Sequence, residues 1–277
     1  MLSRLIGTIM LSFALLCSFS LPGALAAPAA EAPKTLPAAS VFAAMLEKAE
    51  KGEPHAMVLL GSLYEQGIGA PRNFTSAMQW YEKAASAGSA EGYSRLAACY
   101  EVGVGVTANM DTALKNYQKA VDMEFPVAQH KMGTFYLSGN GVSQDVSKGI
   151  SLLSKAAEKW APAGNDLAAI YLNGLFGQTV DQKKAFDLLT KSADQGHVES
   201  MKNLAVMYKD GIGRKADSAS ALRWYLIAQK GGYNAQDLPT VIDGLKKGLK
   251  PAQVKQAETD ASKWVTDFQA KRQQQPK

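Results

Sequence analysis

Cysteine and histidine are scarce in this sequence of 277 residues, which contains two cysteines and three histidines. Cys17 lies in an apolar N-terminal run, so beyond that run only Cys99 remains and the chain cannot build a disulfide framework. Cys99 lies in the segment LAACY on an apolar helix face, and we interpret it as a core residue. None of His55, His130 and His197 has a second histidine or a carboxylate at zinc-site spacing. The sequence therefore predicts no metal ion and no cofactor.

Catalytic motifs are lacking as well. The sequence has no G-x-S-x-G turn, no P-loop lysine and no cysteine and histidine arranged for nucleophilic catalysis. Gly103-x-Gly105 and Gly211-x-Gly213 loosely fit a dinucleotide fingerprint, but that motif follows a strand, whereas a helix is expected to precede both pairs. We therefore predict a protein that is not an enzyme and has no catalytic residues.

Charge of one sign is not concentrated anywhere in the chain. The sequence has 30 lysines and arginines against 25 aspartates and glutamates, a net charge of +5, without a basic cluster or a basic helix face. This distribution argues against nucleic acid as a partner. With 47% hydrophobic and 20% charged residues, the composition is that of a soluble folded protein.

The N-terminus has the pattern of an export signal. Arg4 precedes an apolar run from Leu5 to Leu21, and the small residues Ala24 and Ala26 form a cleavage site after a Pro-Gly break. We predict a signal peptide over residues 1–26, cleaved after Ala26. The alternative is an uncleaved anchor, although the run is shorter than the ~20 residues that a membrane span needs.

The signal predicts a periplasmic or secreted protein without membrane insertion after cleavage. Residues 27–39, rich in alanine and proline, are interpreted as a linker.

Small residues recur in the rest of the chain at a fixed spacing of thirty-six residues. The first set consists of Ala77, Ala113, Gly149, Ala185 and Ala221. The second set, seven residues later, consists of Ala84, Ala120, Ala156, Ser192 and Ala228. Bulky pairs such as Trp80-Tyr81 lie between the two sets, so each repeat contains one helical stripe. We call the helix that carries this stripe helix B.

A second helix, helix A, is predicted upstream in each repeat, where small residues and a tyrosine recur, as in Ala56, Gly61 and Tyr64. Small residues at a helix crossing allow two backbones to approach closely. A glycine follows each tyrosine by three residues where helix A must end, and a left-handed glycine is a common helix stop. We therefore expect positive φ angles at Gly67 and Gly211.

The pattern A-x4-G-x2-Y-x2-G-x-G followed by A-x2-W-Y-x2-A-A-x2-G, from Ala56 to Gly88, resembles the Sel-one-like repeat, a relative of the tetratricopeptide repeat. The resemblance covers residues 40–233 in five units. It implies an all-α fold, a right-handed superhelical solenoid of antiparallel helix pairs, that acts as a scaffold for protein assembly. The fourth unit departs from the pattern, because Tyr171 comes one residue early and the loop reads Gly174-Leu-Phe-Gly177.

Capping helices are expected at both ends of the solenoid, because terminal repeats must cover an apolar face. Ser40 to Lys51 aligns with helix B alone. In the C-terminal segment, residues 234–277, one apolar stripe begins after Asp237 and another after Pro251, and the tail from Lys271 is expected to fray.

The resemblance also implies a binding surface, since the exposed side of helix A lines the concave groove of tetratricopeptide-like superhelices. Carried over by position, the predicted partner-binding residues are His55, Ser62, Glu65, Glu91, Ser94, Glu101, His130, Thr134, Asn165, Asn173, Lys202 and Lys209. The equal alternative is that these side chains are only the solvated faces of their helices. Three of these residues, Glu65, Glu91 and Glu101, are expected to form an acidic strip. We expect the chain to fold when all three are replaced by lysine.

An alternative apolar patch is predicted at two turns between repeats. They carry Met123, Phe125 and Trp160 where the other turns have glycine or polar residues. Packing against the neighbouring repeat is an equal explanation for these side chains.

Taken together, the residues and the resemblance predict a non-catalytic scaffold or regulator in the bacterial cell envelope, which binds a protein partner through the groove. The alternatives are a secreted factor that engages a host protein and, from the resemblance, a cell-envelope enzyme related to β-lactams or peptidoglycan. The sequence predicts neither the identity of the partner nor the oligomeric state.

Overall fold

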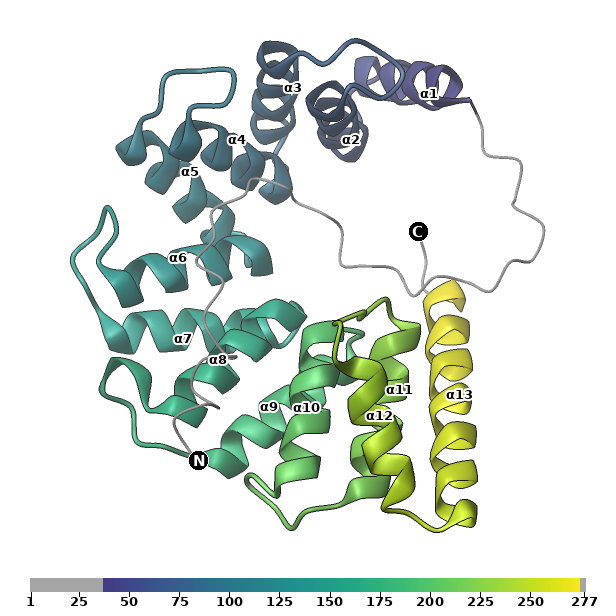
Figure 1. The fold of residues 1–277 in the computed structure, drawn as a ribbon. Helices are drawn as coiled ribbons and strands as arrows, with labels where there is room; N and C mark the ends of the chain where they lie inside the picture. The colour runs from purple at the N-terminus through teal and green to yellow at the C-terminus, as the bar shows by residue number, and fades with distance from the viewer. Residues whose placement is uncertain (1–36, 275–277) are drawn as a thin grey trace. The chain divides into compact units, whose positions relative to one another are not determined.

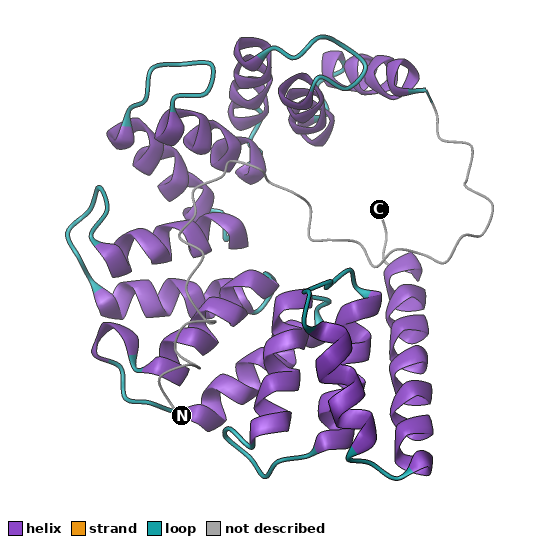
Figure 2. Cartoon of the chain, viewed as in Figure 1, coloured by secondary structure: helices purple, strands orange, loops and turns teal. Residues whose placement is uncertain are grey.

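The computed structural model describes residues 37–274, which form helices joined by short loops and contain no strand (Figures 1 and 2). This confirms the all-α fold class for the described residues. The predicted signal peptide and most of the predicted linker lie outside them, as do residues 275–277.

Ten of the helices form five pairs. The helices A are α2 (Pro54–Gln66), α4 (Ala90–Val102), α6 (Pro126–Ser138), α8 (Ala161–Asn173) and α10 (Val198–Asp210). The helices B are α3 (Phe74–Ser86), α5 (Met110–Asp122), α7 (Val146–Ala157), α9 (Gln182–Asp194) and α11 (Ser218–Lys230). The remaining helices are α1 (Ala38–Glu50), α12 (Leu238–Lys247) and α13 (Pro251–Gln274).

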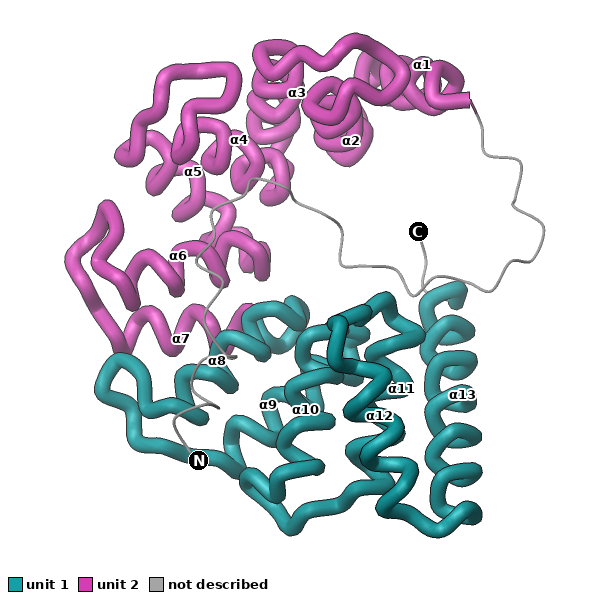
Figure 3. The backbone as a smooth tube through the Cα atoms, viewed as in Figure 1, with its two compact units in different colours: residues 1–28, 157–277 teal, residues 29–156 magenta. Residues whose placement is uncertain are grey.

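The chain divides into two compact units, coloured separately in Figure 3. We call residues 37–156 the N-terminal unit and residues 157–274 the C-terminal unit. In the N-terminal unit each helix from α1 to α5 packs against the next one along the chain. In the C-terminal unit the same holds from α8 to α11, and α12 and α13 both pack against α11. This consecutive pairing is that of an α-solenoid.

Small residues lie where the helices cross, as the repeat predicts. Ala77 in α3 is 2% exposed and Ala113 in α5 is fully buried. A Cβ atom added to Gly61 of α2 would lie 2.5 Å from a ring carbon of Tyr81 in α3. The two helices of a repeat can therefore approach only because this position carries no side chain.

The loop between helix A and helix B is closed at both ends. Gly67 and Gly211 end their helices with φ angles of 71° and 70°, which confirms the predicted helix stops. At the other end, the Oδ1 of Asn73 accepts a hydrogen bond from the backbone N–H of Ser76 at 3.0 Å. The backbone N–H of Asn73 also donates to the carbonyl oxygen of Tyr64 at 2.9 Å, so the tyrosine backbone is joined to the start of helix B.

The same cap recurs in all five loops, at residues one repeat apart in the sequence. The five capping residues are Asn73, Asn109, Asp145, Asp181 and Asp217. Their N–H groups donate to the carbonyl oxygens of Tyr64, Tyr100, Tyr136, Tyr171 and Tyr208. The fourth loop keeps this bond although it contains the short 3-10 turn Leu175–Gly177, with Phe176 at a φ of 55°.

The terminal helices pack as predicted for caps. In α13, Trp264 packs edge-on against Trp224 of α11, with ring centroids 5.8 Å apart, and stacks on Phe268 at 5.0 Å. The helix continues through Gln274, beyond the point where the tail was expected to fray. Within residues 37–274 we find no helix with the length and apolar character needed to cross a membrane.

Candidate partner-binding surfaces

The predicted partner-binding residues on the helices A differ widely in exposure. His55, Asn173 and Lys209 are exposed, whereas Ser94 is buried, with 2% of its surface exposed. The half-buried residues are Ser62, Glu65, Glu91, Glu101, His130, Thr134, Asn165 and Lys202.

The placement of Ser94 on an accessible surface is wrong. Its helix, α4, packs against α3 and α5 and also touches α2, the helix A of the preceding repeat. The helix that carries Ser94 therefore has neighbours in its own repeat and in the preceding one, and Ser94 itself is buried. Ser94 cannot contact a partner in this conformation.

Glu65 and Glu101 of the predicted acidic strip have partners within the chain. The hydroxyl of Tyr81 donates to Glu65 and that of Tyr117 to Glu101, each at 2.8 Å. Both tyrosines are at most 2% exposed, and a buried phenol needs an acceptor. Burial, together with the Glu65 carboxylate, raises the pKa of Tyr81 well above its usual range.

These bonds give the two glutamates a structural role. The Glu101 side chain is only 12% exposed and also pairs with Lys131 at 2.9 Å. Glu91, the third member of the strip, pairs with Arg95 at 3.2 Å on its own helix. The expectation that all three could be reversed to lysine without loss of folding is therefore corrected, because lysine cannot accept the tyrosine hydrogen bonds.

The alternative apolar patch falls on two turns that belong to different units. In the N-terminal unit, Met123 is 44% exposed, while Phe125 is half-buried and packs against the core. Between them Glu124 has a φ of 57°, a left-handed conformation that Gly88 has one repeat earlier. In the C-terminal unit, Trp160 is half-buried at the start of α8. Exposure thus favours Met123 over the other two residues as a contact.

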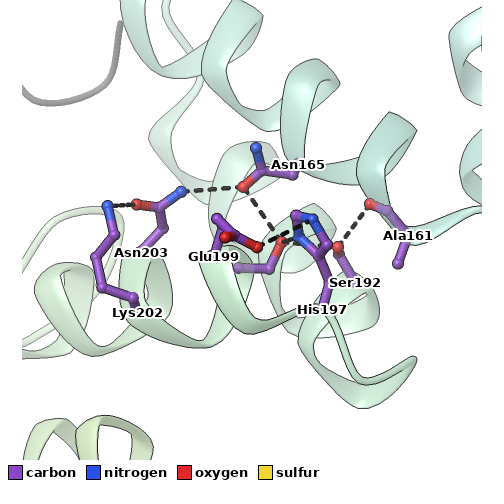
Figure 4. Close-up of polar contacts among 8 residues, drawn as sticks. Ala161, Asn165, Ser192, His197, Glu199, Lys202 and Asn203 are labelled. Atoms are coloured by element: carbon purple, nitrogen blue, oxygen red, sulfur yellow. Dashed lines mark hydrogen bonds and ion pairs between the residues drawn. The ribbon is translucent and has the colours of Figure 1, made fainter. Parts of the chain in front are cut away.

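The C-terminal unit contains a polar cluster that joins α8, α9 and α10 (Figure 4). Its centre is a pair of buried serines, Ser192 of α9 and Ser200 of α10, whose Oγ atoms are 2.7 Å apart. The Oγ of Ser192 also lies 2.7 Å from the carbonyl oxygen of Ala161, and the Oγ of Ser200 lies 3.2 Å from the Oδ1 of Asn165. The two hydroxyl hydrogens are therefore shared among three contacts. The cluster therefore connects the fourth repeat with the fifth.

Two predicted partner-binding residues belong to this cluster. Asn165 of α8 accepts a hydrogen bond from Asn203 of α10 at 3.0 Å, and Asn203 in turn accepts one from Lys202 at 2.6 Å. Burial lowers the pKa of Lys202, and the negative charge of Glu199 opposes that shift. The structure thus brings Asn165 and Lys202 together through a third side chain.

His197 lies at the edge of the cluster, before the first turn of α10. Its Nδ1 is 2.9 Å from the Oγ of Ser200, and its Nε2 is 3.4 Å from an oxygen of Glu199. The imidazole side chain is 13% exposed. Burial lowers the pKa of His197, while the negative charges of Glu199 and Asp166 oppose the shift.

Comparison with protein families matches the five repeats one by one. The model of the Sel1 repeat matches residues 54–89, 90–125, 126–159, 161–197 and 198–233. The chain belongs to the Sel1 repeat family. Sel1 repeats generally mediate contacts between proteins and are typically non-catalytic.

Two solved structures are similar to this chain in fold. A Sel1 repeat protein from Oxalobacter formigenes is 24% identical with a TM-score of 0.64, and the match covers 84% of this chain and 99% of that one. The immunity protein Pa5087 from Pseudomonas aeruginosa is 20% identical with a TM-score of 0.51, covering 83% and 78%. At these identities the likeness establishes the fold alone. The comparison with curated proteins gave no match.

The polar cluster was missed by the sequence reasoning, although the Sel1 repeat pattern contains a signal for it. Ser192 occupies a position where helices B elsewhere have alanine, such as Ala84 and Ala120, and Ser200 is equivalent to Ala56 and Ala128. Two hydroxyl groups at adjoining small-residue positions indicate a buried polar contact, because each supplies the hydrogen-bond partner that the other needs.

Within residues 37–274 no group of three or more histidine, cysteine, aspartate or glutamate side chains is placed to hold a metal ion. Cys99 is buried, at 7% exposure, as the sequence analysis predicted.

Proposed function

We propose that this Sel1 repeat protein is a non-catalytic scaffold or regulator that binds a protein partner through the exposed side chains of its helices A. The observation that carries the proposal is the run of five consecutive Sel1 repeats over residues 54–233. Repeat arrays present extended surfaces that suit protein partners. Helices A of both units contribute accessible polar side chains, with His55 in the N-terminal unit and Asn173 and Lys209 in the C-terminal unit.

The test is site-specific photo-crosslinking in cells that express the full chain. A photoreactive amino acid replaces His55, Asn173 or Lys209, and the matched controls carry it at Gln79 and Asp187, which are exposed on helices B. We expect the helix A positions to crosslink one common protein, and the purified pair to form a complex that is weakened by substitution at those positions. Crosslinks from the helix B positions alone would contradict the proposed surface.

We also propose that the protein acts outside the cytoplasm, in the periplasm or after secretion. The support is the sequence pattern of Arg4, the apolar run from Leu5 to Leu21 and the cleavage site at Ala26. Cell fractionation followed by N-terminal sequencing of the mature protein tests this, and we expect the chain to begin at Ala27. A full-length protein in the cytoplasmic fraction would refute it.

A further inference from the structure

The helix α13 shows what one face of this repeat array can bind. It packs along α11 (Figure 1). The ring of Trp264 packs edge-on against Trp224 of α11 and stacks on the ring of Phe268. The Phe268 ring lies against Gly196, in the turn between α9 and α10, so a Cβ atom added to this glycine would collide with it. Two aromatic side chains four positions apart on one helix therefore fill the space between this turn and Trp224.

A carboxylate completes the site that receives α13. Asp194 is the last residue of α9, and its side chain forms a hydrogen bond with that of Trp264. Because an indole N–H can only donate, Asp194 is the acceptor. Burial raises the pKa of Asp194, and this hydrogen bond opposes the shift. We call Asp194, Gly196 and Trp224 the C-terminal helix site.

An equivalent site lies four repeats earlier in the sequence, in the N-terminal unit. The helices α1, α2 and α3 match α9, α10 and α11 in length and in spacing along the chain. Glu50 ends α1 as Asp194 ends α9. Gly52 follows in the next turn, and Trp80 has the position on α3 that Trp224 has on α11. We call Glu50, Gly52 and Trp80 the N-terminal helix site.

The N-terminal helix site is open in the part of the chain that the structure describes. Apart from its chain neighbours, no atom lies within 4 Å of a Cβ atom added to Gly52. Glu50 is exposed and Trp80 is half-buried, whereas Trp224, which contacts α13, is only 3% exposed. The aromatic rings that fill the C-terminal helix site thus have no counterpart here within residues 37–274.

Among the five repeats, the combination of an acidic residue, a glycine and a tryptophan is confined to these two sites. The three intervening junctions have Ser86, Gly88 and Asn116, then Asp122, Glu124 and Leu152, and then Glu158, Trp160 and Leu188. The turn alone explains Gly52, which has a φ of 88°, so the tryptophan carries the distinction. Trp80 offers a large apolar face, and tryptophan is enriched among the residues that dominate contacts between proteins.

One neighbouring residue differs between the two sites, as expected of a site that is not permanently covered. In the C-terminal unit Ile227, three residues after Trp224, is fully buried. Its equivalent Lys83 is exposed, and its Nζ lies 4.0 Å from the centroid of the Trp80 ring. A lysine keeps this surface compatible with water, and its ammonium group favours an acidic residue on a helix that covers it.

We propose that the N-terminal helix site binds a helix of another protein, and that this helix presents two aromatic residues four positions apart, as α13 does. The aromatic pair packs on Trp80 and over Gly52. A tryptophan at the first of the two positions donates to Glu50, as Trp264 donates to Asp194.

This site is separate from the exposed side chains of the helices A. It consists of the end of α1, the following turn and α3, so binding at either surface does not depend on the other. Because Gln79 adjoins Trp80 on α3, Asp187 is the control that distinguishes the two surfaces in the crosslinking experiment.

The first experiment uses the sequence of α13 as the probe. A fluorescent peptide of residues 251–274 is titrated with the purified full chain, and fluorescence anisotropy measures binding. We expect saturable binding that weakens by at least about tenfold in Trp80→Ala, because tryptophans at the centre of a contact commonly have effects of this size. Asn116→Ala, at the equivalent position of the second repeat, should bind as the wild-type chain does. A peptide with Trp264→Ala and Phe268→Ala should not bind.

Two results of this titration would overturn the proposal. Peptide binding that survives Trp80→Ala would come from exchange with α13 at the C-terminal helix site. Absence of saturable binding to the wild-type chain would show that the N-terminal helix site does not accept a helix of this kind.

The second experiment blocks the site and leaves Trp80 in place. Gly52→Asn puts a side chain where the second aromatic ring must lie, and Gly88→Asn is the matched control. The two glycines have φ angles of 88° and 83° with no atom within 4 Å of an added Cβ, and asparagine tolerates this backbone. Both variants should keep the circular-dichroism signal of the wild-type chain, and only Gly52→Asn should lose peptide binding. Equal affinities of the two variants for the peptide would refute the proposal.

Sedimentation of the chain without peptide tests the other possible occupant, a second copy that offers its own α13. We expect the wild-type chain and Gly52→Asn to have the same mass in solution. A wild-type dimer that dissociates in Gly52→Asn would assign the site to self-association and overturn its assignment to another protein.

Discussion

The glycines at two positions of the repeat allow a test that separates backbone strain from close packing. Gly105, in the loop after α4, has a φ of 73°, and a Cβ atom there would lie 2.6 Å from the carbonyl oxygen of Phe74, the first residue of α3. Gly88, in the turn before α4, has a φ of 83°, but no atom lies within 4 Å of an added Cβ. Replacing each by alanine imposes similar strain, and only Gly105→Ala adds a collision with backbone.

The two losses of unfolding free energy can be estimated from these distances. A left-handed conformation costs a non-glycine residue about 1–2 kcal/mol, and the reduced freedom of the unfolded chain returns about 0.4–1 kcal/mol. Gly88→Ala should therefore lose about 1 kcal/mol. For Gly105→Ala we add about 1–3 kcal/mol of overpacking, since the colliding atom is a backbone carbonyl that cannot rotate away, for a total of about 2–4 kcal/mol.

Urea unfolding, followed by far-ultraviolet circular dichroism, measures both losses, and hydrogen exchange at the α3 and α4 amides localises them. Exchange is needed because repeat arrays can unfold in parts, and the global transition then averages over both units. Equal losses for Gly105→Ala and Gly88→Ala would refute the close approach of the loop to α3. A larger loss for Gly88→Ala would refute the reasoning on both sites.

Three further predictions concern single side chains. Glu101→Leu should lose about 1–3 kcal/mol of unfolding free energy because it removes the hydrogen bond that the buried hydroxyl of Tyr117 donates to Glu101, whereas Glu101→Gln, which can still accept, should lose less in the same urea assay. Glu124→Gly should raise the melting temperature, because glycine adopts the left-handed backbone at φ 57° without strain and the free energy of unfolding should increase by about 0.5–1 kcal/mol. An unchanged melting temperature would argue against strain in this turn. Burial alone would raise the pKa of Asp217, but hydrogen bonds from Ser220 and Ala219 lower it overall, so its contribution to stability should disappear as pH falls below about 4. Asp217→Asn retains an N-cap and should lose that pH dependence in acid titrations of stability.

The architecture could be predicted from the sequence because helix crossings restrict the residues at a few positions. Ala77 and its equivalents are small for a steric reason that acts identically in every repeat, so the spacing alone identifies the helix pairs. The capping residues Asn73 and Asp217 are equally periodic, and attention to asparagine and aspartate before helix B would have identified them.

The roles of individual polar side chains were harder to predict. The sequence predicts Glu65 to be a surface residue, because the residues around it do not show that the hydroxyl of Tyr81, sixteen residues later, donates a hydrogen bond to its carboxylate. Ser94 was misplaced for a related reason, since its helix packs against helices of the preceding repeat as well as against its own partner, and the repeat pattern does not show that this position is buried. The role of a polar side chain depends on which side chains it contacts on other helices. A repeat pattern specifies such contacts only at positions where it restricts the residue type.

The serine pair between α9 and α10 restricts the order in which repeats of this chain can be rearranged. At the junction of α3 with α4, Ala84 faces Gly92, and such small apolar junctions can be duplicated or exchanged without leaving a polar group behind. A fifth repeat inserted after α5 would instead bring Ser200 to the position that faces Ala120, where its hydroxyl would lose the contacts that Ser192 and Asn165 of the fourth repeat provide. The penalty of about 1–3 kcal/mol for an unsatisfied buried hydroxyl would act against gene duplications that separate the two repeats. The fourth and fifth repeats are therefore expected to be inherited as one block, while the earlier repeats remain free to vary in number.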